Sequence, residues 1–227
     1  MATTPAEKLE SITLETADNP DSAIIWLHGL GADGNDFVPI VDQLQLPSEL
    51  AIRFIFPHAP IRPVSLNQGY PMRSWYDLYG LSFNEREDAP GIHAAAEQIM
   101  QLCQQQQDAG IASQRIFLAG FSQGGALALY TGLRYPQPLG GIIALSTYLC
   151  LHDTLTTEMS PYATQLPVFM AHGLQDEVLP FDFGKKSAEL LQSVGIPVDW
   201  HDYAMGHSVC PQEIQAIRQW LTLNAIG

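Results

Sequence analysis

Short apolar runs recur along this chain of 227 residues, and several are stopped at once by glycine, proline or histidine. Their isoleucine-rich composition favours strands that are buried on both faces. The runs that we interpret as strands are residues 23–27, 52–56, 115–119, 141–145, 168–171 and 197–203. Six buried strands need a sheet that is covered on both sides, and this requirement restricts the fold more than any other feature.

Stretches with helical spacing of apolar residues lie between these runs, at residues 92–107, 124–134, 181–194 and 211–223. The last stretch opens with Pro211, which suits the first position of a helix. The alternation predicts the α/β class, with a mainly parallel central sheet and helices on both faces. Active sites in such sheets form at the carboxyl ends of the strands.

Two segments depart from this alternation. Residues 9–15 alternate between apolar and polar side chains, which indicates an antiparallel edge strand. Residues 61–90 show no clean period, and an irregular segment of that length is usually functional or contains small elements. We expect one domain over residues 1–227, with the irregular segment near the active site.

Charge and composition exclude several functions. The net charge is −14 and lysine and arginine number only ten, which argues against nucleic acid as a partner. Residues 1–8 lack the pattern of a secretory signal, and no apolar run reaches the roughly 18 residues of a membrane span. We therefore expect a cytoplasmic protein without stable membrane insertion. Three widely spaced cysteines fit reduced thiols in that compartment.

Residues 120–124 read GFSQG, and this G-x-S-x-G pattern lies between a predicted strand and a predicted helix. The pattern needs small residues on both sides of the serine because the turn is sharp. It places the Ser122 hydroxyl over a helix N-terminus, where developing negative charge is favoured. The alternative is a glycine-rich turn whose serine only caps the helix. We predict that Ser122 is a nucleophile.

A serine nucleophile needs a base, and in this fold an acid and then a histidine follow the serine along the chain. His207 comes after the strand at residues 197–203, in a loop at the same sheet edge, and is the predicted base. Asp176 follows the strand at residues 168–171 and is the predicted acid, with Asp153 as the main alternative. Its role is to orient His207 and to stabilise the imidazolium.

Two backbone N–H groups are expected to bind the oxyanion, those of Gln123 and Leu30. Residues 29–34 also read GLGADG, which matches the dinucleotide pattern G-x-G-x-x-G. That interpretation requires an acidic residue at the end of the second strand, where Pro57 and His58 stand instead. We therefore expect no nucleotide cofactor, and no metal-binding spacing is present either.

Five blocks of sequence resemble the phospholipase/carboxylesterase family, in the order of that family. They are residues 27–34, 57–60, 74–77, 120–125 and 206–208. The resemblance implies the α/β-hydrolase fold, with Ser122, Asp176 and His207 as triad and Leu30 and Gln123 as oxyanion donors. It also implies hydrolysis of short to medium acyl esters, lysophospholipids or S-acylated proteins, without a cofactor and often as a weak homodimer.

The predicted acyl groove rests on apolar residues of the irregular segment and of two loops. Its candidate lining residues are Trp75, Leu78, Leu81, Phe83, Tyr148 and Val178. Aromatic and aliphatic residues are as often buried for packing alone. The chain departs from the family at Leu174, which replaces an aspartate before the acid, and at Tyr148, where some members carry tryptophan. A non-catalytic acyl-chain binding protein is the alternative of another class.

Overall fold

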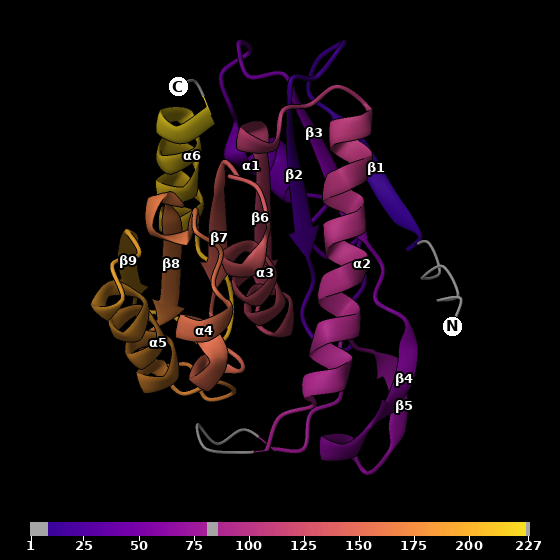
Figure 1. Ribbon diagram of the computed structural model, residues 1–227, viewed down its shortest axis with the longest axis vertical. Coiled ribbons are helices and arrows are strands. Elements are labelled where there is room, and N and C mark those ends of the chain that lie inside the picture. The colour runs from indigo at the N-terminus through magenta and orange to yellow at the C-terminus, as the bar shows by residue number, and fades with distance from the viewer. Residues whose placement is uncertain (1–8, 81–85, 226–227) are drawn as a thin grey trace.

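A seven-stranded sheet forms the centre of the molecule in a computed structural model that describes residues 9–80 and 86–225 (Figure 1). Its strands, in spatial order, are β1 (Ser11–Glu15), β3 (Ile52–Pro57), β2 (Ser22–Leu27), β6 (Ile116–Phe121), β7 (Gly141–Leu145), β8 (Val168–Gly173) and β9 (Val198–Tyr203). β1 is antiparallel to β3, and every other neighbouring pair is parallel. The predicted α/β class and the antiparallel edge strand are therefore confirmed.

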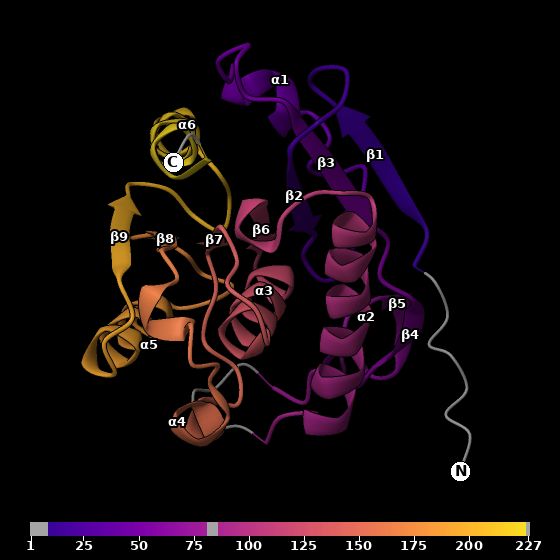
Figure 2. The same ribbon diagram turned by 45° about the horizontal axis from the view of Figure 1, so that its top comes forward.

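Helices cover both faces of this sheet (Figure 2). On one face lie α2 (Ala89–Asp108), α3 (Gln123–Arg134) and α5 (Phe181–Ser193), and on the other lie α1 (Ile40–Leu44) and α6 (Pro211–Ala225). Side chains of a strand point alternately to the two faces. In β2, Ile25 and Leu27 thus join one apolar cluster, whereas Ile24 and Trp26 join the other.

The segment that was expected to be irregular contains a hairpin. β4 (Ile61–Val64) and β5 (Tyr70–Arg73) form a small antiparallel sheet that stands apart from the central one. The short helices α1 and α4 (Leu155–Glu158) were not predicted either, since four or five residues are too few to show a helical period. No helix in the described part of the chain is long and apolar enough to cross a membrane.

The carboxyl ends of four parallel strands lead into the predicted site residues. Leu30 comes three residues after β2, Ser122 follows β6, Asp176 comes three residues after β8, and His207 comes four residues after β9. Because parallel strands end at one edge of the sheet, residues from distant parts of the chain are brought to the same place.

Glu213, in the first turn of α6, is a buried carboxyl group beneath this edge. Its side chain is fully buried, and its Oε2 accepts a hydrogen bond of 3.3 Å from the Cys210 amide. Its Oε1 has no partner among the described residues. Burial disfavours the charged form and raises the pKa of Glu213 from 4.5 to about 8.

We predict that Glu213→Gln removes a pH dependence of stability. A carboxyl whose pKa is raised on folding binds a proton that the unfolded chain releases, so the free energy of unfolding falls as pH rises from about 4.5 to 8. Urea unfolding measures the free energy of unfolding at pH 5 and at pH 8. Between these two values it should fall by a few kcal/mol more in the wild type than in the variant. Exposed Glu189→Gln is the control. Equal pH dependence in all three proteins would contradict the prediction.

Candidate active site

Ser122 occupies a strained turn between β6 and α3. Its φ of 55° and ψ of −121° lie in a region that side chains rarely adopt. Two hydrogen bonds hold the turn: the Ser122 amide donates to the Leu145 carbonyl oxygen at 2.9 Å, and the Thr147 hydroxyl donates to the Ser122 carbonyl oxygen at 2.7 Å. The turn directs the serine side chain out of the sheet and into a pocket.

Glycines at both ends of the GFSQG segment make this turn possible. A Cβ atom at Gly120 would lie 2.3 Å from the Gly124 carbonyl oxygen, and one at Gly124 would lie 2.3 Å from the Leu27 carbonyl oxygen. Both distances are far inside van der Waals contact, and the obstructing atoms belong to backbone. The steric reason for small residues on both sides of Ser122 is therefore present in the fold.

Asp176 and His207 lie in hydrogen-bond contact. His207 Nδ1 is 2.7 Å from Asp176 Oδ2, and Asp176 Oδ1 accepts the amides of Val178 at 3.0 Å and Leu179 at 2.8 Å. A carboxylate only accepts, so the proton of a neutral His207 sits on Nδ1. Its Nε2 is then free to accept a proton, and both His207 and Ser122 line the same pocket.

The alternative acid lies elsewhere. Asp153 belongs to a short 3-10 turn, its side chain is 93% exposed, and its carboxylate is 3.3 Å from the ring of its neighbour His152. The arrangement therefore favours Asp176 as the partner of His207.

His172 is a residue at this site that the sequence analysis did not assign. It is fully buried at the end of β8, its Nε2 donates to the Leu179 carbonyl oxygen at 2.9 Å, and the same nitrogen lies 3.4 Å from Asp176 Oδ2. Burial lowers the pKa of His172, which keeps the ring neutral. The histidine thereby supports the loop that carries the acid. Its position directly after a strand was the available signal.

The two predicted oxyanion donors line the pocket beside Ser122. Gln123 is the first residue of α3, and the first amides of a helix have no partner within it. Leu30 lies in the loop after β2, next to Gly29. A Cβ atom at Gly29 would lie 3.5 Å from Ser122 Cβ, so this loop passes close to the serine turn. Two residues from different segments, Leu30 and Gln123, thus line one pocket beside Ser122.

The pocket has a volume of about 390 Å³ and mostly apolar walls. Three of the predicted groove residues, Leu78, Tyr148 and Val178, line this pocket. Leu66, Tyr76 and Leu179 also line it and were not predicted, since nothing in their local sequence distinguishes them from core residues. Leu81 and Phe83 lie outside the described residues.

The prediction that Trp75 lines the acyl groove is wrong. Its side chain is fully buried and lines no part of the pocket. The indole Nε1 donates instead to the His28 carbonyl oxygen at 2.9 Å, so the ring faces the backbone behind the pocket wall. The Trp75 side chain thus lies near the site, but it does not contact the space where an acyl chain would bind.

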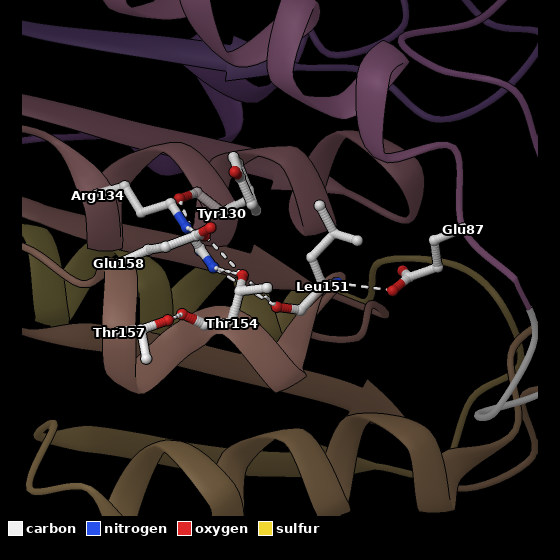
Figure 3. Close-up of polar contacts among 7 residues, drawn as sticks. All are labelled: Glu87, Tyr130, Arg134, Leu151, Thr154, Thr157 and Glu158. Atoms are coloured by element: carbon white, nitrogen blue, oxygen red, sulfur yellow. Dashed lines mark hydrogen bonds and ion pairs between the residues drawn. The ribbon is translucent and has the colours of Figure 1, made fainter.

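A polar cluster fixes the loop after β7 (Figure 3). Tyr148 of the same loop lines the pocket. Arg134 donates to Glu158 and to the Thr154 hydroxyl, each at 2.9 Å. Leu151, whose φ is 47°, donates its amide to Glu87 Oε2 at 2.7 Å. These contacts tie the loop to α3, to α4 and to the segment before α2.

No group of three or more histidine, cysteine, aspartate or glutamate side chains in the described part of the chain has the geometry to hold a metal ion. The glycine-rich loop that also matched the dinucleotide pattern lines the pocket of Ser122 through Gly29, Leu30 and Ala32.

This sheet order and the serine turn after β6 are those of the α/β hydrolases, and solved structures of that class superpose well. One is *Zea mays* acyl-protein thioesterase 2, with a TM-score of 0.86 and 31% identity over 95% of this chain and 99% of that one. Another is *Arabidopsis thaliana* SOBER1, with a TM-score of 0.85 and 31% identity over 89% of this chain and 98% of that one.

Sequence comparison narrows the class to a family. Residues 10–225 match the model of the phospholipase/carboxylesterase family. A protein of *Gibberella zeae* named acyl-protein thioesterase 1 is 37% identical over 94% of this chain and 95% of its own length. A probable carboxylesterase of *Oryza sativa* is 35% identical over 88% and 76%. The chain belongs to the phospholipase/carboxylesterase family, as its five sequence blocks predicted.

Proposed function

We propose that this chain is a serine carboxylesterase, which hydrolyses carboxylic esters with short to medium acyl chains through an acyl-enzyme intermediate. One observation carries the proposal: Ser122 and His207 line one pocket, and Asp176 holds the Nδ1 side of His207 at 2.7 Å. A weak hydroxyl nucleophile, an oriented base and a buried acid are the parts that this chemistry needs.

The proposed reaction takes two steps, acylation of Ser122 and hydrolysis of the acyl-enzyme. His207 Nε2 accepts the Ser122 hydroxyl proton while Oγ bonds to the ester carbonyl carbon, and the carbonyl oxygen becomes an oxyanion. The amides of Leu30 and Gln123 stabilise that charge. His207 then donates the proton to the departing alcohol. A water molecule, deprotonated by His207, then attacks the acyl carbon. The bond from that carbon to Ser122 Oγ breaks, His207 returns the proton to Oγ, and the carboxylic acid is released.

The pocket walls support a limit on the acyl chain. We assign Leu78, Tyr148 and Val178 to acyl binding, because they are apolar surface beside the nucleophile. The hydroxyls of Tyr76 and Tyr148 lie 3.2 Å apart in the same wall. This polar pair disfavours the passage of a long hydrocarbon chain. A chain that passed between the two hydroxyls would break the hydrogen bond that joins them and would offer no replacement.

S-acylated substrates are the second candidate, supported by the thioesterase names of relatives such as that of *Gibberella zeae*. Thioesters react through the same acyl-enzyme, with a thiol as the leaving group. A cytoplasmic setting, which we also propose, agrees with three free cysteines, of which Cys103 and Cys150 are buried.

The charge around the pocket supports a preference in the leaving group. Among the described residues that line the pocket, Asp36 is the one carboxylate, and lysine and arginine are absent. The adjacent Phe37 ring packs on Phe121 at 5.7 Å, which in turn packs on His207 at 4.6 Å. We therefore assign Asp36, the neighbour of Phe37, to the His207 side of the pocket, where the leaving group receives its proton. The whole chain has a net charge of −14. Because Asp36 adds a negative charge at this side of the pocket, we expect a neutral or cationic leaving group to be favoured there.

We predict that Ser122→Ala lowers the hydrolysis of nitrophenyl esters by roughly 10⁴-fold or more, because the nucleophile is lost. In the wild type, a series from acetate to laurate should peak at short or medium chains. Ser146→Ala is the matched control, because Ser146 also directly follows a strand and has a positive φ of 44°. This variant should keep the wild-type rate of hydrolysis. Wild-type rates in Ser122→Ala would refute the assignment. A wild type that binds acyl chains yet fails to react with a fluorophosphonate would be a non-catalytic binder.

We also predict that Asp36→Asn lowers kcat/KM for butyrylcholine by about three- to tenfold, relative to phenyl butyrate, because it removes one nearby negative charge. Butyryl-coenzyme A, with its anionic leaving group, should be the poorest wild-type substrate and should improve in the variant. Asp42→Asn, an exposed change of equal charge in α1 away from the pocket, is the control. Identical substrate ratios in both variants would exclude a local effect of Asp36.

A further inference from the structure

The two oxyanion donors come from segments that are far apart in the chain, and one residue contacts both segments. Leu30 follows β2, whereas Gln123 begins α3. The Trp75 backbone amide donates to Gln123 Oε1 at 3.0 Å, and the Trp75 indole Nε1 donates to the His28 carbonyl oxygen at 2.9 Å. Trp75 is itself fully buried and does not line the pocket.

On the α3 side, the whole side-chain amide of Gln123 is used to bind the segment around Trp75. Besides accepting from the Trp75 amide, it donates from Nε2 to the Tyr76 carbonyl oxygen at 2.8 Å and to the Ser74 hydroxyl at 3.0 Å. Gln123 is only 3% exposed. The residue whose backbone N–H is one oxyanion donor is therefore held by three consecutive residues of another segment.

On the β2 side, the His28 ring sets the direction of the other donor. The Ala59 amide donates to His28 Nε2 at 3.0 Å, so the ring proton is on Nδ1, which donates to the Gly29 carbonyl oxygen at 2.7 Å. Burial lowers the pKa of His28 and keeps this neutral form. In a trans peptide, the N–H points opposite to the C=O. The Leu30 N–H therefore points away from the His28 ring.

The Trp75 and His28 rings lie against each other, with centroids 5.1 Å apart. The tryptophan thus contacts both the ring and the carbonyl group of the residue that orients the Gly29–Leu30 peptide. Loss of the indole N–H would leave the buried His28 carbonyl oxygen without this donor. The His28–Gly29 peptide could then shift, and the Gly29–Leu30 peptide that follows it would shift as well.

We propose that Trp75 is a positioning residue, which fixes the spacing and direction of the two oxyanion donors through His28 and Gln123. The inference rests on the proposed function, because it requires an oxyanion to form. Such donors accelerate a reaction only if they are in place before the charge develops, and a displacement of about 1 Å can cost 10²-fold in rate.

The test is Trp75→Phe, which removes the indole N–H but keeps an aromatic ring and the backbone amide. We expect kcat to fall roughly tenfold to a hundredfold with KM nearly unchanged. Inhibition by a phenylboronic acid, which forms a tetrahedral adduct with serine, should weaken by a similar factor. Trp26→Phe is the matched control: Trp26 is also buried, lies in β2, and its Nε1 has no partner among the described residues. It should keep kcat and boronic acid affinity.

A second pair of variants decides the matter if Trp75→Phe does not fold. His28→Asn keeps an N–H near the Nδ1 position, whereas His28→Leu removes it, so the asparagine variant should retain the higher kcat at similar KM. Wild-type kcat in Trp75→Phe, or equal kcat in the two His28 variants, would overturn the inference. Fluorophosphonate labelling of the wild type distinguishes a failure of this inference from a failure of the proposed function. If the wild type did not label, the proposed function itself would be refuted.

Discussion

The close packing of the start of α3 against the end of β2 is the contact on which the rest of the site depends. Gly124 has no side chain, and the space that a Cβ would need is occupied by the Leu27 and His28 carbonyl oxygens. This approach brings the turn at Ser122 beside the loop at Leu30, so that Ser122, Gln123 and Leu30 from separate segments line one pocket. A methyl group at Gly124 would push the two segments apart.

The parallel sheet supplies the remaining geometry. Its strands deliver Ser122, Asp176 and His207 to one edge, although the three residues span much of the chain. Hydrogen bonds then orient what the topology has assembled. Two backbone amides donate to one carboxylate oxygen of Asp176, and His207 contacts the other. His172 supports the loop that carries Asp176 through its hydrogen bond to the Leu179 carbonyl oxygen. The strained backbone of Ser122 persists because its amide and carbonyl oxygen are both bound.

Much of this arrangement follows from local sequence signals. Buried strands of five or six apolar residues are easily recognised, and chain order pointed to Asp176 and His207, which the structure brings into contact. α2 begins three residues before the predicted start because Asp88 caps it by accepting the Gly91 amide. Trp75 was assigned to the substrate because an aromatic residue in an aperiodic segment carries no sign of which way it faces. The roles of His172 and of the Gln123 side chain depend on contacts across the fold, which no local pattern reveals.

We propose that an acyl group becomes bonded to Ser122 during turnover. Acid quenching of the enzyme during hydrolysis of a nitrophenyl ester, followed by mass spectrometry of its peptides, tests this directly. We expect the acyl mass on the peptide that contains Ser122, with the acyl group added and lost at least as fast as kcat. An acyl group on another residue, such as Cys210, or turnover without any acylated peptide, would contradict it.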